Sequence, residues 1–358
     1  MTRKRKQMEI LNLRGIGKSK YKVTALFMGI VMLLCGCRPF SGLTVSDVNT
    51  EDGTETMSND SLISVGFSQL GSESTWRSAN TESVKAALST GNGFFLIFDN
   101  ARQKQEKQFK AVRGFISQRV DYIVICPVIQ DGWDVVLSEA KDAGIPVILL
   151  DRYISVADES LYTTFIGEDM YAEGASAGKW LESYLEEEGI AGEDINIVVL
   201  EGTSGSSAQA GRTKGFGAIA ARHMNWNMLA SANGEFTQAK GKETMARLLH
   251  EFDDIDIIVC QNDDMAFGAL EALNEAGIKT GGKGEKVLIS FDGTKQALEL
   301  VEQGVINVDI ECNPNSGDLL SKVISDLEDG NPIEKTYYMD EKVFTKENVS
   351  EYIEDRNY

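Results

Sequence analysis

The sequence predicts an α/β protein built from two doubly wound parallel-sheet lobes. Short apolar runs alternate with amphipathic segments, and a parallel strand covered on both faces needs such near-continuous Val, Ile and Leu content. The alternation occurs in two successive blocks, residues 61–166 and 167–313. The chain beyond residue 60 is also about 300 residues long, more than a single hydrophobic core usually holds, which favours two domains.

Seven short apolar runs are predicted to be buried strands, four in the first block and three in the second. They comprise residues 62–67, 94–98, 122–126, 146–150, 195–200, 257–260 and 287–291. The segments between them show helical spacing: Phe109, Val112 and Ile116, for example, share one face of a helix. Repeated strand–helix units with right-handed connections form parallel sheets.

The first 36 residues are predicted to be a secretory signal peptide and not part of the fold. Basic residues dominate positions 1–22, and the apolar run 23–34 is shorter than the roughly 20 residues of a membrane-spanning helix. The motif Leu-Cys-Gly-Cys37 resembles a bacterial lipobox. We therefore expect Cys37 to be lipidated and to hold the protein on the outer side of the bacterial cell membrane. An uncleaved transmembrane anchor is the alternative, and it would also place the remaining chain outside the cell.

The composition is strongly acidic, with 35 Lys and Arg against 55 Asp and Glu and a formal net charge of −20. Residues 1–36 hold eight of the basic residues and one acid, so the chain without them carries a formal charge of −27. Such a surface repels nucleic-acid phosphates and anionic membrane faces. We therefore expect no nucleic-acid partner, attachment to the membrane by the lipid alone, and a ligand that is neutral or held by local basic groups.

Residues that could support metal or redox chemistry are few. Besides Cys35 and Cys37 the cysteines are Cys126, Cys260 and Cys312, whose spacing fits no Cys-x-x-Cys pattern and whose odd number cannot pair completely. Cys126 and Cys260 end apolar runs, so buried and inert thiols are expected. His223 and His250 are the two histidines of the sequence. No metal site and no cofactor are therefore predicted.

Ligands of open α/β sheets bind beyond the carboxyl ends of the strands, so the residues after each predicted strand are candidates for a site. The candidates are Trp76, Arg77, Asp99, Gln103, Asp151, Arg152, Arg212, Phe236, Asn262 and Asp292. Carboxylates accept hydroxyl protons, guanidinium groups donate in a fixed fork and amides do both, while aromatic rings cover apolar C–H faces. This combination suits a neutral sugar.

Some positions near the strand ends also have structural explanations, which stay open at this point. Arg152 could merely neutralise Asp151 as a surface ion pair. Asp263, which follows a predicted strand closely, is typical of a residue that caps the next helix. Trp133 opens a predicted helix and could pack only on its own lobe.

Segments around the candidates resemble a known family, in the family's order, along almost the whole body of the chain. They are Val65–Arg77, Gln103–Gln108, Lys110–Arg113, Ile145–Arg152, Glu201–Gly205, Arg212–Phe216, Gly234–Thr237, Asn262–Met265 and Ser290–Gly293. On these segments the chain is similar to the periplasmic sugar-binding proteins of the ribose/galactose type, the class I solute-binding proteins of ABC transporters. Trp76 and Arg77, where ribose binders carry paired phenylalanines, favour the galactofuranose-binding branch.

The resemblance implies sugar contacts for most of the candidates. Seven positions match residues that contact sugar in the wider family, namely Trp76, Asp151, Arg152, Arg212, Phe236, Asn262 and Asp292. Arg77, Asp99 and Gln103 are further candidates. The chain departs from the family at Glu311-Cys312-Asn313, where ribose binders carry a glutamine, and this departure leaves the identity of the sugar open.

The resemblance also implies that the chain crosses between the lobes three times at a hinge, as in class I periplasmic binding proteins. A flexible tether rich in Ser, Thr and Asp would precede the folded body. The predicted limits are 1–36 for the signal peptide, 37–60 for the lipidated Cys37 and the tether, 61–166 plus 314–341 for the N-terminal lobe, and 167–313 plus 342–358 for the C-terminal lobe.

The expected function is the capture of a monosaccharide, galactofuranose or a related sugar, by hinge closure and its delivery to the permease of an ABC transporter. The protein is expected to act as a monomer and not as an enzyme. Glycoside hydrolysis needs two carboxylates that flank the bond, and nothing in the sequence marks an acid of raised pKa. A binding protein that reports to a membrane sensor kinase or chemoreceptor is the main alternative.

Overall fold

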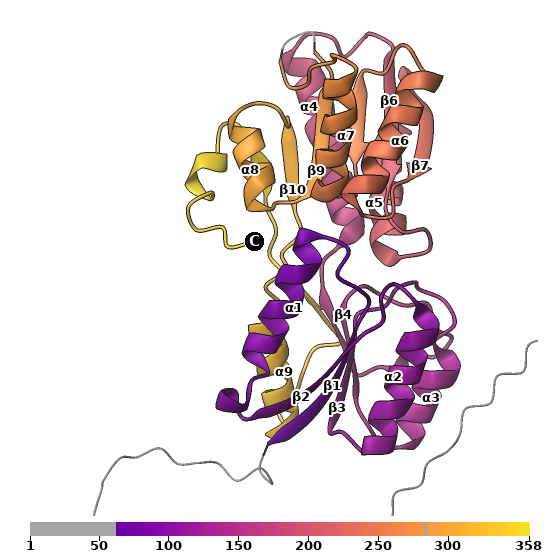
Figure 1. The fold of residues 1–358 in the computed structure, drawn as a ribbon, viewed down its shortest axis with the longest axis vertical. Coiled ribbons are helices and arrows are strands. Elements are labelled where there is room, and N and C mark those ends of the chain that lie inside the picture. Colours follow the sequence, from indigo (N-terminus) through magenta and orange to yellow (C-terminus); the bar gives the residue numbers. More distant parts are fainter. Residues whose placement is uncertain (1–61, 283–284) are drawn as a thin grey trace, which may run out of the picture. The chain divides into compact units, whose positions relative to one another are not determined.

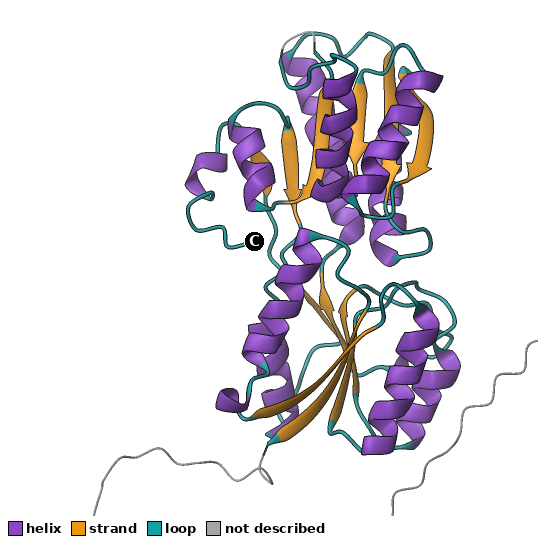
Figure 2. Ribbon diagram, in the orientation of Figure 1, coloured by secondary structure: helices purple, strands orange, loops and turns teal. Residues whose placement is uncertain are grey.

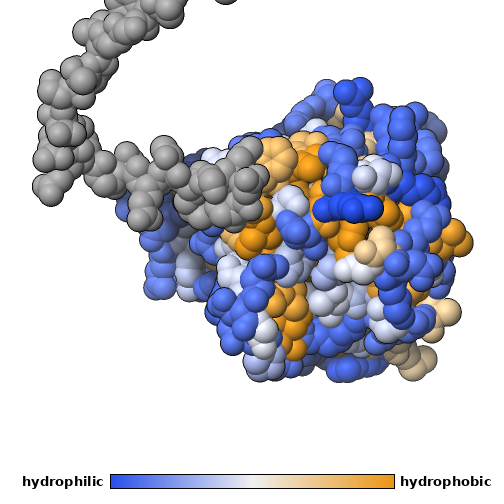
Figure 3. Space-filling view, turned by 90° about the horizontal axis from the view of Figure 1, so that it is seen from below, coloured by the Kyte–Doolittle hydropathy of each residue, from blue (hydrophilic) through white to orange (hydrophobic). Residues whose placement is uncertain are grey.

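The computed structural model describes residues 62–282 and 285–358, which form two six-stranded sheets covered by helices (Figures 1 and 2). The predicted signal peptide, Cys37 and the tether lie outside these residues. Within the described part of the chain, no helix is long and apolar enough to cross a bilayer. Hydrophilic side chains cover most of the face shown in Figure 3, and apolar ones form separate groups among them.

The first sheet contains strands from both ends of the described chain. Its order is β11-β5-β4-β3-β1-β2, and every neighbouring pair is parallel. The strands are β1 (Ile63–Gln69), β2 (Phe94–Asn100), β3 (Tyr122–Ile125), β4 (Val147–Asp151), β5 (Thr164–Gly167) and β11 (Thr336–Tyr338). The helices are α1 (Thr75–Ala87) and α9 (Gly317–Glu328) on one face, and α2 (Gln105–Gln118) and α3 (Asp134–Asp142) on the other (Figure 1).

The second sheet has the order β12-β10-β9-β8-β6-β7 and is parallel except for the pair β10 and β12. Its strands are β6 (Ile195–Glu201), β7 (Trp226–Asn233), β8 (Ile257–Cys260), β9 (Val287–Asp292), β10 (Val308–Glu311) and β12 (Val343–Thr345). Its helices are α4 (Met170–Glu187) and α5 (Ser207–Ala220) on one face, and α6 (Gln238–Glu251), α7 (Asp263–Glu275) and α8 (Lys295–Glu302) on the other. Among residues 62–282 and 285–358, three short 3-10 helices complete the elements: η2 (Thr90–Asn92), η3 (Glu159–Leu161) and η4 (Val349–Glu351).

Each face of each sheet has its own hydrophobic core. In β3, Tyr122 and Val124 belong to the core beneath α1 and α9, whereas Ile123 and Ile125 belong to the core beneath α2 and α3. Successive side chains of a strand point to opposite faces of the sheet. A central strand of a sheet that is covered on both faces must therefore be apolar at every position, which is the pattern from which these strands are predicted.

All seven predicted strands are present, each within two residues of its predicted limits, whereas β5, β7, β10, β11 and β12 escape prediction. Strand β10 reads Val-Asp-Ile-Glu, and its two acids, Asp309 and Glu311, are buried in spite of their charge. Strand β7 lies at the edge of its sheet and is partly exposed. Neither strand carries the continuous apolar run of a central strand, because its side chains meet solvent or buried polar partners.

The chain passes between the two sheets three times. Strand β5 leads into α4 through residues 168–169, β10 leads back to α9 through residues 312–316, and β11 leads to β12 through residues 339–342. These three crossings and the two parallel sheets confirm the predicted fold class. The exact limits of the lobes stay a prediction.

Candidate functional site

A small cavity lies beyond the carboxyl ends of strands from both sheets. Its lining consists of Glu73, Ser74, Trp76, Arg77, Asp151 and Arg152 from the first lobe, and Met170, Ala208, Arg212, Phe236, Asn262, Asp292 and Cys312 from the second lobe and the second crossing. Eight of the ten candidates from the sequence lie in this set.

Helix caps place several of these side chains at the cavity. Trp76 and Arg77 lie in the first turn of α1, whose N-cap Ser74 accepts a hydrogen bond of 3.1 Å from the backbone N–H of Arg77. Asn262 caps α7 in the same way and accepts a bond of 3.0 Å from the backbone N–H of Met265. Because a cap starts the helix directly after the strand, these residues are held at the carboxyl end of the sheet.

An unusual backbone conformation occurs at three lining residues. Asp151 ends β4 with φ 61°, Asp292 ends β9 with φ 118°, and Phe236 has φ 59°. Positive φ is disfavoured for residues other than glycine and concentrates at functional sites. At Asp151 and Asp292 it coincides with the point where the strand stops and its last side chain reaches the cavity, whereas Phe236 lies three residues beyond the end of β7.

In the first lobe, Arg77 is the centre of a buried ion-pair network. Its NH1 atom lies 2.6 Å from Asp151 Oδ2, and its Nε lies 3.1 Å from Glu73 Oε1. Burial acts to lower the pKa of Arg77, but the negative charges of Asp151 and Glu73 outweigh it and hold this pKa well above its ordinary value. Two acids of the cavity, Asp151 and Glu73, therefore already form ion pairs with Arg77.

Arg152 is less completely paired than Arg77. Its Nε lies 3.9 Å from Asp151, and burial together with the like charge of Arg77 lowers its pKa. An arginine in a protein nevertheless stays protonated. Arg152 therefore presents to the cavity a positive charge, because the acid nearest to it, Asp151, lies closer to Arg77.

The second lobe supplies a matching arrangement around Arg212. Its Nε lies 2.5 Å from Glu173 Oε2, its NH2 lies 3.6 Å from Asp292 Oδ1, and its NH1 donates to the carbonyl oxygen of Gln261. Burial raises the pKa of Asp292 well above its ordinary value, and the charge of Arg212 offsets only part of this effect. Each lobe therefore contributes guanidinium and carboxyl groups to the same small space.

Two buried polar atoms of the cavity lining, Arg152 Nε and Glu73 Oε2, have no hydrogen-bond partner among residues 62–282 and 285–358. Two aromatic side chains, Trp76 and Phe236, also line the cavity and are 3% and 4% exposed. The guanidinium of Arg152 lies 5.2 Å from the ring centre of Phe236, which belongs to the other lobe. Since buried polar groups are normally hydrogen-bonded, these walls suit a ligand with hydroxyl groups and an apolar face.

The two lobes touch each other around the cavity. The backbone N–H of Thr75 donates to Asp264 over 3.1 Å, and the indole Nε1 of Trp76 donates to the carbonyl of Cys312 over 2.6 Å. A third bond of 2.8 Å joins the Tyr153 backbone N–H to Ser207 Oγ. These contacts close the cavity, so the structure represents a closed arrangement of the lobes.

The structure places Asp99 and Gln103 outside the cavity. Asp99 is half-buried in β2, the edge strand of the first sheet, where it pairs in register with Ser68. Gln103 follows in a left-handed turn, and its backbone N–H donates to Leu70 over 2.6 Å. In the first sheet the cavity is lined from the segment after β1 and from the end of β4, whereas β2 lies at the edge of this sheet.

The alternative explanations for three residues can now be compared with the structure. Arg152 is 3% exposed, so the interpretation as a surface ion pair is wrong. Asp263 is not the cap of α7, a position that belongs to the residue before it; it is buried and accepts a bond of 2.5 Å from Ser290. Trp133 is fully buried and packs edge-on against Phe109 with ring centres 5.1 Å apart, as the packing interpretation predicts.

Sequence reasoning missed five lining residues, of which Glu73 and Cys312 matter most for the chemistry. Glu73 lies in the polar segment after the first strand, so the rule that selected Trp76 and Arg77 could also have selected it. Cys312 had a weaker signal, because it follows β10, a strand that was itself not predicted. Met170 and Ala208 are apolar residues at helix starts, and no pattern marks them.

Comparison with known proteins gives a consistent result. Residues 65–320 match the family model described as the periplasmic binding protein domain. The galactofuranose-binding protein YtfQ of Escherichia coli K12 is 41% identical over 257 residues, which are 71% of this chain and 78% of YtfQ. A protein of Mycobacterium smegmatis, solved in complex with β-D-fucofuranose, has a TM-score of 0.79 and 38% identity, and the match covers 83% of this chain and 95% of that one.

A third similar protein belongs to a signalling system. It is the fructose-binding periplasmic domain of a hybrid two-component system, with a TM-score of 0.73 and 26% identity. The match covers 82% of this chain and 94% of that domain. The same fold with a related sequence therefore occurs in a sensor as well as in sugar-binding proteins.

Proposed function

Because the chain belongs to the periplasmic binding protein family, we propose that it captures a neutral monosaccharide in the furanose form, galactofuranose or a close relative, outside the cytoplasm. The observation that carries this proposal is the closed cavity with two aromatic side chains, three arginines and three carboxyl groups on its walls. Two similar proteins support the furanose form, since one is named for galactofuranose and the other was solved with β-D-fucofuranose.

The lining assigns a role to each type of side chain. Trp76 and Phe236 would cover the apolar C–H faces of the sugar ring, and Arg152 would donate to ring or hydroxyl oxygens. Asp151 and Asp292 would accept hydroxyl protons, and Asn262 offers both a donor and an acceptor. Arg77 and Arg212 would hold these carboxylates in place and add donors of their own.

The charge balance of the lining favours an uncharged ligand. Glu73, Asp151 and Asp292 stand against Arg77, Arg152 and Arg212, so the formal charges cancel. A sugar phosphate or a uronic acid would add an uncompensated negative charge to a buried site, and such burial is costly. A neutral sugar needs no compensating charge.

Binding would act through hinge closure. We propose that residues 61–166 with 314–341 and residues 167–313 with 342–358 move as two bodies about the three crossings. Each body supplies about half of the polar side chains, so the full binding free energy is available only in the closed arrangement. The sugar thereby shifts the equilibrium towards that arrangement.

A thermal-shift screen of monosaccharides tests the binding proposal. A ligand at 100 times its Kd adds about 2.7 kcal/mol to the free energy of unfolding. We expect galactose and arabinose to raise Tm, because their solutions contain some of the furanose form. Methyl furanosides are locked in that ring form, so they show whether the protein requires a furanose ring. Methyl pyranosides of the same sugars are the matched controls. Stabilisation by the pyranosides and not by the furanosides would contradict the furanose proposal.

The closed form would then deliver its sugar to the permease of an ABC transporter. In this proposal Cys37 is lipidated, the protein acts as a monomer, and it breaks no bond of the sugar. A sensor that reports to a membrane kinase is the second candidate, because one similar domain comes from a two-component system. Cells that lack this protein distinguish the two. Loss of uptake of the labelled sugar supports delivery, whereas normal uptake with a lost transcriptional response supports sensing.

A further inference from the structure

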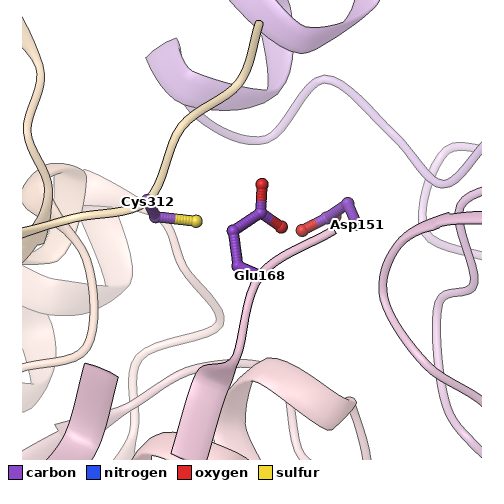
Figure 4. A group of neighbouring side chains, drawn as sticks. All are labelled: Asp151, Glu168 and Cys312. Atoms are coloured by element: carbon purple, nitrogen blue, oxygen red, sulfur yellow. The ribbon is translucent and has the colours of Figure 1, made fainter. Parts of the chain in front are cut away.

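Acidic and thiol side chains from all three crossings between the sheets meet in the interior beside the cavity. Glu168 lies in the first crossing, Cys312 in the second and Glu341 in the third. The carboxylate of Glu168 lies between the side chains of Asp151 and Cys312 (Figure 4). We call Asp151, Glu168, Cys312 and Glu341, with Glu173 of α4, the hinge cluster.

The potential ligand atoms of the hinge cluster form two overlapping triads. The carboxylates of Asp151 and Glu168 and the sulfur of Cys312 lie within 4.8 Å of one another, and so do the carboxylates of Glu173 and Glu341 and the same sulfur. Glu168 and Glu173 are 3% and 2% exposed, and Cys312 is 2% exposed. The thiol of Cys312 is therefore the point at which both triads meet, away from bulk water.

The carboxyl groups of the hinge cluster differ in their partners. Among the described residues, no hydrogen bond reaches Glu168 Oε1 or Glu168 Oε2, whereas the carboxyl groups of Glu173 and Glu341 bond to each other. Arg77 and Arg212 pair with two other members of the cluster, Asp151 and Glu173, and among the described residues neither forms an ion pair with Glu168. Burying a carboxyl group without a partner is costly, and a bound cation would give the unpartnered oxygens of Glu168 a partner.

We propose that the hinge cluster binds a divalent metal ion of the zinc type, with Cys312 and Glu168 as ligands and neighbouring carboxylates as the remaining ones. Thiolate and carboxylate ligands together are typical of Zn²⁺, which takes four ligands in a compact tetrahedron. Ca²⁺ takes six to eight oxygen ligands and no sulfur. The positive charge of the ion would offset the negative charge of the ligating carboxylate and thiolate groups, and binding would displace the thiol proton of Cys312.

A second opening gives an ion a route to the hinge cluster. A second cavity adjoins Asp151 and Glu168 and is further lined by Tyr153, Phe165, Asp169, Met170, Ser207 and Tyr338. Tyr338 is 60% exposed and therefore lies at the solvent side. Asp169, at the same opening, adds a third carboxylate that attracts cations.

The spacing rules applied to the sequence could not reveal this site. Glu168, Cys312 and Glu341 are separated by 144 and 29 positions, far from any Cys-x-x-Cys or His-x-x-x-His pattern. The sequence prediction of no metal site rested on those patterns. The three crossings of the fold bring the residues together instead.

Thermal unfolding of the metal-stripped full-length chain, without sugar, tests the proposal. We expect Zn²⁺ to raise Tm in a saturable way and Mg²⁺ and Ca²⁺ to leave it unchanged, because an ion that binds the folded state stabilises it by mass action. Glu168→Gln and Cys312→Ser should lose at least three quarters of the zinc-induced shift. Cys260→Ser, which alters a buried thiol outside the hinge cluster, should keep it.

Two features keep this experiment decisive. All variants retain Cys35 and Cys37, so any zinc bound near the N-terminus contributes equally to each. Co²⁺ provides a second readout, since a cobalt–thiolate bond absorbs strongly in the near ultraviolet and Cys312→Ser should remove that band. The proposal is overturned if zinc does not raise Tm, if calcium stabilises the protein instead, or if both cluster variants keep the full zinc response.

Discussion

Arg152→Ala is expected to weaken sugar binding by at least about 100-fold, which corresponds to about 2.7 kcal/mol. Arg152 is buried at the cavity, its Nε has no hydrogen-bond partner in the described structure, and its guanidinium faces Phe236 of the other lobe. Arg152 NH1 already donates to the carbonyl oxygen of Val128, so the sugar would accept from the Nε of this charged group, which has no acceptor among the described residues. Titration of the sugar followed by tryptophan fluorescence measures the loss, because Trp76 lies in the same cavity.

The fold should survive this substitution. Arg77 holds Asp151 at 2.6 Å, whereas Arg152 approaches Asp151 only to 3.9 Å. Removing Arg152 also removes a like charge that acts against Arg77. Circular dichroism and Tm of the sugar-free protein should therefore stay close to those of the parent.

Two further variants sharpen the result for Arg152. Arg152→Lys keeps the charge but loses the planar fork, so it should bind sugar more weakly than the parent and more tightly than the alanine variant. Arg113→Ala is the matched control, because Arg113 forms an exposed ion pair with Glu139 in the same lobe. Unchanged affinity in Arg152→Ala would mean that the cavity described here is not the sugar site.

Gly215→Ala is expected to lower the free energy of unfolding by at least about 2 kcal/mol, the usual range for overpacking being roughly 1–3 kcal/mol. Gly215 lies on α5 where this helix crosses α4. A Cβ atom there would lie 2.1 Å from the carbonyl oxygen of Tyr171 and 2.7 Å from the backbone nitrogen of Ala175. Both obstacles are backbone atoms, so the two helices would have to move apart.

Gly217→Ala is the control for this prediction on the same helix. Gly217 is exposed, and a Cβ atom there would meet nothing within 4 Å. Alanine should therefore stabilise α5 by about 0.5–1 kcal/mol through its higher helix propensity. Thermal unfolding of both variants checks the pair, and equal changes of Tm would show that α4 and α5 are not packed as described.

The central strands were predictable because their physical environment constrains every residue. Strand β3 is buried on both faces, so each of its four positions must be apolar, and the run at 122–126 shows it directly. Strand β10 has the same burial but contains Asp309 and Glu311. Groups from other parts of the fold contact these acids: the Gly293 backbone N–H donates to Asp309, and Arg356 pairs with Glu311. A local pattern holds no information about such partners.

The candidate site was predictable to the extent that it follows strand order. Residues after strands, such as Asp151 and Asp292, reach the cavity because the carboxyl ends of parallel strands share one edge of the sheet. Asp99 follows the same rule and lies outside the cavity, because the first sheet lines the cavity from the segment after β1 and from the end of β4 and not from the edge strand β2. The sequence shows that a strand ends, but not where that strand lies within the sheet.

The sequence by itself determined the two-block α/β architecture and most of the residues around the cavity, because burial on both faces and the strand-end rule act locally. The tertiary structure alone decided which strand ends converge and how Arg77 and Arg212 are neutralised. It also decided that Glu168, Cys312 and Glu341 meet. These outcomes depend on the three crossings between the sheets, which place residues far apart in the chain within a few ångströms of one another.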